Sequence, residues 1–301
     1  MEFPISGVTV NPLALAAIGF LVGILGGFFG VGGGFIAGPS MILLGVPTNF
    51  VVGTDMAHIT GKSIVAARRH RTLGHVDVRL GVLMIVGTIP GVEAGAQVIE
   101  RLEALGNIDE VIGGAYVVIL LIIAGFTAWE SLRALRVVQT ERISAKDALG
   151  FRGAARRVQA IRLPPRISFP QSGIASLSVW AVIGVGFASG FLAAMLGAGG
   201  GFIRMPMLVY LLGMPTHVAV GTDLFEIVIS AGFGTITHAI KGNVDILMAL
   251  VMQTGAAIGA QIGAVSTRYV SGPRIRLAFS ILPVVGAVLV LFRLILGGGA
   301  E

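Results

Sequence analysis

Long apolar segments alternate with short polar connections along the whole chain. A membrane span needs about 20 apolar residues. Segments close to that length cover residues 12–29, 50–67, 80–99, 111–129, 176–196, 218–240, 246–266 and 277–296. Two further apolar pieces, residues 35–46 and 202–214, are too short to cross upright. The pattern predicts an all-α polytopic membrane protein in which each short piece is a broken half-helix that follows a glycine-rich cluster.

The second half of the chain repeats the first. Matching motifs occur in the same order with one inserted residue: Gly30-Val31-Gly32-Gly33-Gly34 and Gly197-Ala198-Gly199-Gly200-Gly201, Pro47-Thr48 and Pro215-Thr216, Gly53-Thr54-Asp55 and Gly221-Thr222-Asp223, Val76-Asp77 and Val244-Asp245. A Gly-x-x-x-Gly-x-x-x-Gly run follows in each half, from Gly87 and from Gly255. We therefore divide the chain into a first transmembrane repeat (1–132), a basic connector (133–172) and a second transmembrane repeat (173–301).

The distribution of positive charge orients these repeats. Nine of the 21 Lys and Arg residues lie between positions 133 and 166, which indicates a cytoplasmic connector under the positive-inside rule. If the short pieces cross, each half has five crossings and the halves are inverted; Arg268, Arg274 and Arg276 are then cytoplasmic and Lys241 is outside. If they are re-entrant, each half has four crossings and these assignments reverse. Three cations against one favour two inverted repeats of about five segments.

Composition narrows the class of protein. Hydrophobic residues make up 55% of the chain and charged residues 12%, against roughly 25% charged in a globular protein, which excludes an ordinary soluble domain. The net charge of +6 lies mostly in the connector, so it does not indicate a nucleic-acid partner; this connector can also touch anionic lipid heads. The absence of cysteine excludes disulfides and Cys-ligated metals. We expect no cofactor and no metal site.

The two glycine clusters are the first candidates for chemistry. Backbone that is broken inside a membrane must be satisfied by protein, water or ligand, and the N-terminal end of a short helix favours an anion. The candidate substrate-binding glycines are Gly32, Gly33, Gly34, Gly199, Gly200 and Gly201. The alternative is that they only permit close helix packing, which is the favoured interpretation of the later runs from Gly87 and Gly255.

These motifs resemble the TauE/SafE family of sulfite and organosulfonate exporters. The resemblance rests on the paired glycine clusters, on Gly45-Val46-Pro47 and Gly213-Met214-Pro215, and on Gly-Thr-Asp in each half, and it covers residues from about 19 to about 286. It implies a secondary transporter of small, often sulfur-containing anions or carboxylated relatives. One position departs from the pattern: Arg204 stands where the family's stretch is usually apolar, and its repeat mate is Ala37.

Two basic residues are candidate anion contacts. Arg204 follows the second glycine cluster by three residues, and a guanidinium binds carboxylate or sulfonate oxygens in bidentate fashion. Its alternatives are snorkelling to the interface and pairing with an acid such as Glu226. Lys62 shares a helix face with His58 and Asp55, so it either contacts the anion or neutralises Asp55.

Four titratable residues are candidates for a coupling proton or ion: Asp55, His58, Asp223 and Glu226. His58 aligns with Glu226, and each stands one helical turn beyond the Asp of its repeat. Proton-coupled carriers use such intramembrane groups. The alternative for both Asp residues is a helix N-cap. Asp77 and Asp245, at a repeated turn, are interpreted as turn and N-cap residues, and Gln253 either binds substrate or joins helices.

The sequence therefore predicts a carrier of a small anion in a prokaryotic inner membrane, and not an enzyme. Its expected partners are the substrate, a coupling proton or sodium ion, and membrane lipid, whereas its oligomeric state stays open. An anion-selective channel is the second interpretation, although no ring of charges is evident. A membrane enzyme is the third, because His-Glu-x-x-His and Gly-x-Ser-x-Gly motifs are absent.

Overall fold

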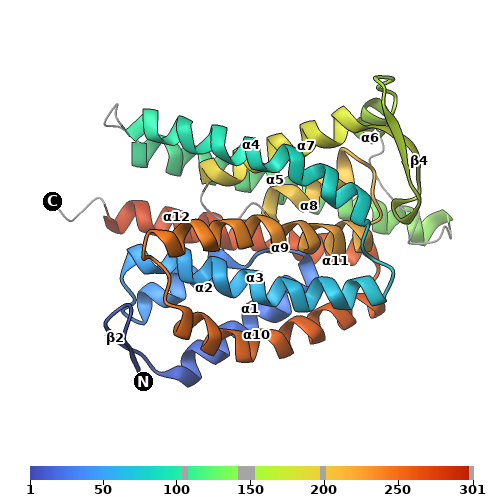
Figure 1. Cartoon of the computed structure of the whole chain (residues 1–301). Coiled ribbons are helices and arrows are strands. Elements are labelled where there is room, and N and C mark those ends of the chain that lie inside the picture. The colour runs from blue at the N-terminus through green and yellow to red at the C-terminus, as the bar shows by residue number, and fades with distance from the viewer. Residues whose placement is uncertain (104–107, 142–152, 197–200, 298–301) are drawn as a thin grey trace. The chain divides into compact units, whose positions relative to one another are not determined.

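The computed structural model describes residues 1–103, 108–141, 153–196 and 201–297 (Figure 1). In chain order its elements are β1 Glu2–Phe3, β2 Val8–Thr9, α1 Pro12–Phe29, α2 Gly34–Leu43, α3 Thr48–Thr72, α4 Val78–Glu103, α5 Ile108–Glu141, α6 Gly153–Gln159, β3 Arg166–Phe169, η1 Pro170–Ser172, β4 Ile174–Ser178, α7 Val179–Leu196, α8 Gly201–Tyr210, α9 Thr216–Ile240, α10 Ile246–Ser266, η2 Thr267–Tyr269, α11 Gly272–Phe279 and α12 Ile281–Gly297.

These elements fall into two compact units. Unit 1 comprises Met1–Ile85 and His217–Tyr269, and unit 2 comprises Val86–Thr216 and Val270–Glu301. Each unit therefore contains segments of both sequence repeats: the first half-helix, α2, belongs to unit 1 and the second, α8, to unit 2.

The helices are those of an integral membrane protein. Within the described ranges, five helices are long and apolar enough to cross a bilayer: Pro12–Phe29, Val78–Gly95, Val117–Val137, Thr216–Ile240 and Ile246–Tyr269. By contrast, α2 and α8 have 10 residues each. At about 1.5 Å per residue, either one spans about half of the hydrocarbon core. The two short helices after the glycine clusters are confirmed.

Two predicted segments have different boundaries in the structure. The segment expected at 277–296 is divided between α11 and α12, because Pro283 lacks the N–H that would continue a helix through Ser280. In contrast, α5 continues to Glu141, through a stretch without Gly or Pro. Arg133 and Arg136, which the sequence analysis assigned to the connector, therefore lie on this helix.

Each repeat opens with a short antiparallel hairpin that the all-α prediction missed. β1 pairs with β2, and β3 pairs with β4. The two hairpins share the motif Phe-Pro-x-Ser-Gly, at residues 3–7 and 169–173. Gly7 and Gly173 have φ values of 71° and 67°, in the left-handed region that favours glycine, and Phe3 and Phe169 are fully buried. The sequence thus contained a signal for both hairpins.

In unit 1, α1 and α10 pack with their backbones in direct contact (Figure 1). A Cβ atom added at Gly259 would overlap the Phe20 carbonyl oxygen, and one at Gly23 would meet the backbone of Ala256. Gly87 on α4 meets the backbone of Ile183 on α7 in the same way within unit 2. These contacts confirm the packing interpretation of both glycine runs.

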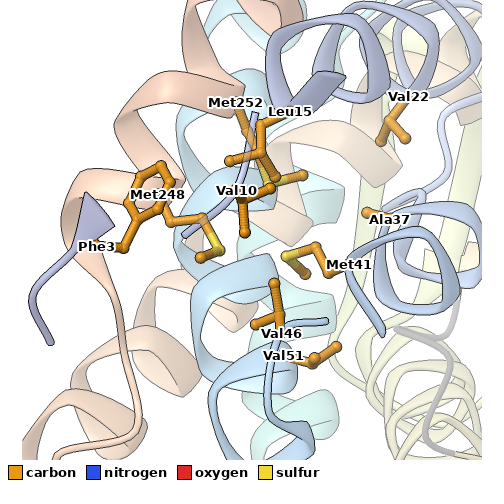
Figure 2. Close-up of a cluster of buried hydrophobic side chains, with 10 residues drawn as sticks. All are labelled: Phe3, Val10, Leu15, Val22, Ala37, Met41, Val46, Val51, Met248 and Met252. Carbon is orange, nitrogen blue, oxygen red and sulfur yellow. The ribbon is translucent and has the colours of Figure 1, made fainter. Parts of the chain in front are cut away.

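The N-terminal hairpin packs against α1 and α10 and contributes to one apolar cluster of unit 1. Phe3 and Val10 lie against α1 and α10 in Figure 2, which also shows Leu15, Val22, Ala37, Met41, Val46, Val51, Met248 and Met252. Ser6 fixes the hairpin to the start of α10, because its backbone N–H and its hydroxyl donate to Asp245 Oδ2 at 3.1 and 2.7 Å. The hairpin is therefore part of the core.

Reciprocal hydrogen bonds join the two repeats inside unit 1. The Asp245 N–H donates to Thr54 Oγ1 and the Asp77 N–H donates to Thr222 Oγ1, both at 2.9 Å. Each Asp also accepts at 3.1 Å from a backbone N–H in the first turn of its own helix, which confirms both as N-caps. Such an exchange of equivalent contacts is what a local two-fold relation produces.

We predict that Gly259→Ala destabilises the protein by about 1–3 kcal/mol, because the added methyl group forces α1 and α10 apart. The measurement is the thermal unfolding midpoint of the purified protein in detergent. Gly184→Ala on α7 is the matched control, since nothing lies within 4 Å of its added Cβ. Equal midpoints for the two variants would contradict this account of the packing.

Candidate functional site

The first glycine cluster breaks the chain between α1 and α2. Gly30 ends α1 with a φ of 81°, and its N–H donates to the Gly26 carbonyl at 2.9 Å. Gly33, with a φ of 89°, precedes the first residue of α2 and has no side chain to cap that helix. The start of α2 thus offers backbone N–H groups beside a left-handed turn that only glycine adopts readily.

Lys62 of α3 reaches this break. It is buried, with 1% of its surface exposed, and its Nζ donates to the Val31 carbonyl at 2.9 Å. A Cβ at Gly33 would lie 3.5 Å from Nζ, and one at Gly26 would overlap it. The glycines therefore leave room for an ammonium group against broken backbone.

A second polar pair lies one and two turns earlier on α3. His58 Nδ1 lies 3.3 Å from Asp55 Oδ1, and both residues are buried. A Cβ at Gly34 would be 2.7 Å from Asp55 Oδ2, so this carboxylate faces the first turn of α2. Because α3 begins at Thr48, Asp55 lies inside the helix and the N-cap interpretation is wrong.

Helix α9 adds two more acids to unit 1. Asp223 and Glu226 are fully buried, and Asp223 lies inside α9, which begins at Thr216, so it is not an N-cap either. Asp55 and Asp223 both attract the Lys62 ammonium electrostatically. Glu226 Oε2 accepts a hydrogen bond of 3.4 Å from Ser230, the repeat mate of Lys62. Lys62 is thus surrounded by negative charge.

The buried polar atoms of unit 1 that have no hydrogen-bond partner within the described part of the chain include His58 Nε2, Ser63 Oγ and Gln253 Oε1. Gln253 of α10 lies against α3, where a Cβ at Gly61 would be 2.8 Å from Oε1. Leaving such an atom unpaired costs about 1–3 kcal/mol. Such unpaired atoms on α3 and on the helix packed against it are typical of a site that binds a polar ligand.

The second glycine cluster belongs to unit 2 and is described only in part. Gly199 and Gly200 lie outside the described residues, whereas Gly201 begins α8 and is buried. Arg204, in the first turn of α8, is 2% exposed and interacts with other groups of the protein. Its burial excludes snorkelling. Because Lys62 lies in unit 1, the joint role of the two basic residues stays a prediction.

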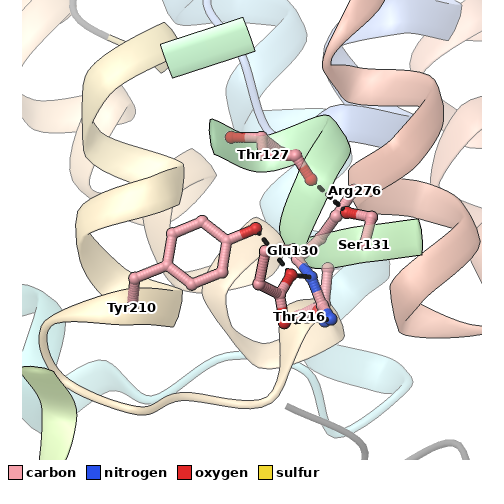
Figure 3. Close-up of polar contacts among 6 residues, drawn as sticks. All are labelled: Thr127, Glu130, Ser131, Tyr210, Thr216 and Arg276. Carbon is pink, nitrogen blue, oxygen red and sulfur yellow. Dashed lines mark hydrogen bonds and ion pairs between the residues drawn. The ribbon is translucent and has the colours of Figure 1, made fainter. Parts of the chain in front are cut away.

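Unit 2 contains a buried network that the sequence analysis missed (Figure 3). Arg276 of α11 donates from Nε and Nη2 to the two carboxylate oxygens of Glu130 on α5, at 3.0 and 3.2 Å. Its Nη1 donates to Thr216 Oγ1 at 2.7 Å. The Tyr210 hydroxyl, at the end of α8, donates to Glu130 Oε2 at 2.9 Å. These bonds use both carboxylate oxygens and all three guanidinium nitrogens.

The sequence analysis missed this network because the predicted membrane segment 111–129 ends one residue before Glu130. The predicted segment ends at Trp129 and does not include Glu130, whereas Arg276 is counted as a cytoplasmic charge. Arg276 is in fact 2% exposed, unlike the exposed Arg268 and Arg274. A carboxylate inside an apolar helix is expected to have a cationic partner, and this rule would have marked Glu130 as a candidate without naming Arg276.

A metal centre finds no support in the part of the chain that the structure covers, where no group of three His, Cys, Asp or Glu side chains converges. His70 instead lies 2.8 Å from the Gly27 carbonyl and 3.3 Å from His75.

Comparison with known proteins agrees with the glycine break and the helical membrane fold. Residues 15–290 match the family described as Sulfite exporter TauE/SafE. The chain belongs to the TauE/SafE family. Relatives of this chain are named as probable membrane transporter proteins. No solved structure matches the chain.

Two relatives match over most of the TauE/SafE sequence. Probable membrane transporter protein YunE of Bacillus subtilis is 27% identical over 268 residues, covering 84% of this chain and 88% of the relative. Probable membrane transporter protein YjnA of the same organism is 26% identical and covers 92% and 99%. A relative from Methanocaldococcus jannaschii, MJ0441, is 23% identical over 294 residues.

We predict that Glu130→Leu and Arg276→Met each destabilise the protein by about 3–5 kcal/mol, because each leaves a buried charge without its counterion. The double variant is expected to recover most of that loss, since it removes both charges. The measurement is a double-mutant cycle on unfolding in detergent. If the loss in the double variant equals the sum of the single losses, the two residues do not act as a pair.

Proposed function

We propose that this TauE/SafE protein is a secondary transporter of a small anion. The substrate is sulfur-containing (sulfite, an organosulfonate or thiosulfate) or a small carboxylate, and it crosses by alternating access of two inverted halves of a prokaryotic inner-membrane protein. In this proposal each glycine break, the one before α2 and the one before α8, is a candidate binding place for the anion. The family's description as a sulfite exporter supports the substrate class.

The observation that carries this proposal is the position of Lys62 against the first break. Its ammonium lies beside Val31 and Gly33, next to the start of a half-helix. Helix N-termini and buried cations both stabilise anions. A small oxyanion in this place would gain both interactions at once, and Arg204 in the first turn of α8 would supply the corresponding cation in the second repeat.

The charges of unit 1 support coupling to protons. Three carboxyl groups, those of Asp55, Asp223 and Glu226, are buried in unit 1. They outnumber the one buried lysine, Lys62. An anion approaching Lys62 would meet net negative charge unless protons bound first. If Asp55 accepts the His58 Nδ1 proton, Nε2 is the atom that gains and releases the transported proton. We propose Asp55 and His58, with Asp223 and Glu226, as this coupling site.

We predict saturable uptake of radiolabelled sulfite into proteoliposomes, with accelerated exchange when unlabelled sulfite is present on the opposite side. A proton gradient should drive accumulation, whereas a sodium gradient should not. Thiosulfate, taurine and acetate, tested as competitors, rank the substrate class. Asp55→Asn should keep sulfite exchange but lose accumulation, because the proposed proton site loses the carboxylate that contacts His58.

Flux that never saturates and shows no exchange would identify a channel instead of a carrier. Folded, monodisperse protein that moves none of the four anions would overturn the proposed substrate class. Accumulation driven by sodium would contradict the proton site only.

We further predict that Lys62→Gln lowers the rate of sulfite exchange about 10- to 100-fold, the equivalent of one lost charged hydrogen bond. Gly26→Ala should do the same without removing the charge, because its methyl group displaces the ammonium from Val31. Gly125→Ala on α5, where an added Cβ has open space, is the control. Normal exchange in both Lys62→Gln and Gly26→Ala would exclude Lys62 from the substrate site.

A further inference from the structure

The segment before α7 exposes a concentration of positive charge. Arg156 and Arg157 on α6, Arg162, and Arg166 on β3 are all exposed. No Asp or Glu occurs between positions 153 and 180. The only polar contact of these four guanidinium groups in the described structure is a bond of 3.4 Å from Arg166 to the Ser176 carbonyl. Their charge is therefore available to an external partner.

Large apolar side chains are exposed on the same segment. Ile161 is 38% exposed, Leu163 57% and Trp180 57%. Trp180 stands in the first turn of α7, and its indole Nε1 donates to the Pro164 carbonyl at 3.1 Å, which fixes the segment to the helix. In Figure 1, α6 and the β3–β4 hairpin lie together at the N-terminal end of α7. Arginines interleaved with exposed apolar groups are typical of a membrane interface.

Helix α5, which leads into the connector, also carries an exposed tryptophan beside an arginine. Trp129 of α5 is 50% exposed, and the guanidinium carbon of Arg133 lies 5.7 Å from its ring centroid. The chain has only two tryptophans, and they stand on the two helices that border the connector. Tryptophan collects at the level of the lipid head groups, so both ends of the connector are marked as interfacial.

The fold that the two hairpins share does not involve the four arginines. The hairpin of the first repeat has the same Phe-Pro-x-Ser-Gly motif and the same buried phenylalanine. Aligned on this motif, residues 2–9 correspond to residues 168–175, and neither stretch contains Lys or Arg. Arg156, Arg157, Arg162 and Arg166 all precede that shared stretch.

We propose that α6, the β3–β4 hairpin and Trp180 form a docking surface for anionic phospholipids at the cytoplasmic membrane face. The four arginines contact lipid phosphates, and Ile161, Leu163 and Trp180 enter the boundary between head groups and acyl chains. This surface orders the connector against the bilayer. The inference is independent of which anion the protein transports.

The test uses Trp180 as a local reporter. Trp129→Phe leaves Trp180 as the only tryptophan, and this background is reconstituted into phosphatidylcholine vesicles with brominated phosphatidylglycerol or brominated phosphatidylcholine as quencher. A cation at an anionic surface gains about fivefold in binding. We expect the phosphatidylglycerol to bind next to Trp180 at least about fivefold more strongly. Replacing Arg156, Arg157, Arg162 and Arg166 by Gln should bring this ratio close to 1.

The matched control replaces four exposed arginines of unit 1 by Gln: Arg68, Arg71, Arg79 and Arg268. This control should keep the preference at Trp180. If the fourfold connector variant does not fold, the pairs R156Q/R157Q and R162Q/R166Q and a salt titration replace it, since 1 M salt reduces the screening length to about 3 Å. Salt should abolish the preference reversibly.

Three results would overturn the proposal. Equal quenching by both lipids in the Trp129→Phe background would show no anionic selectivity. If the unit 1 control loses the selectivity at Trp180 equally, the selectivity arises from the net charge of the protein and not from this surface. If neither lipid quenches Trp180 and the protein is a dimer in detergent, a second copy of the chain covers this surface.

Discussion

A bilayer offers no hydrogen bonds to an exposed peptide group, and the structure of this protein depends on how it meets that constraint where its helices break. At the break between α1 and α2, glycine conformations turn the chain sharply, and Lys62 satisfies the Val31 carbonyl. The same absence of side chains lets the ammonium approach the backbone. Structural support and the anion-binding surface that we propose therefore rest on one arrangement, because a hydrogen bond to a neutral carbonyl does not neutralise the ammonium.

The two buried charge clusters differ in how completely they are satisfied. Glu130 and Arg276 neutralise each other, and Tyr210 and Thr216 complete their hydrogen bonds. Such a saturated pair fixes one arrangement of its helices and leaves little capacity for a ligand. In unit 1, by contrast, the buried Asp55, Asp223 and Glu226 outnumber the one buried lysine, Lys62, and His58 Nε2 lacks a partner among the described residues. Only the second arrangement can change its protonation or accept an anion without breaking an existing network, which is why we place transport there.

The sequence predicted the helical membrane class, the glycine breaks and the short helices, because these follow from local hydropathy and from backbone conformations that few residues adopt. It also predicted the caps at Asp77 and Asp245. The N-cap interpretation of Asp55 was wrong, because α3 begins at Thr48, seven residues before Asp55. The Glu130–Arg276 pair was beyond local reasoning, because its partners are 146 positions apart. Local patterns fix elements, whereas long-range partners of buried charges require the fold.

Duplication explains the architecture but not the chemistry. The reciprocal bonds of Thr54 with Asp245 and of Thr222 with Asp77 keep the two repeats equivalent at the backbone. The polar side chains depart from that equivalence: Lys62 faces Ser230 in the repeat alignment, His58 faces Glu226, and Arg204 faces Ala37. A symmetric site would place identical charges together, and their repulsion would raise the cost of burial. By distributing two cations, one imidazole and one extra acid unevenly between the repeats, the chain can bury opposite charges while both halves retain a common fold.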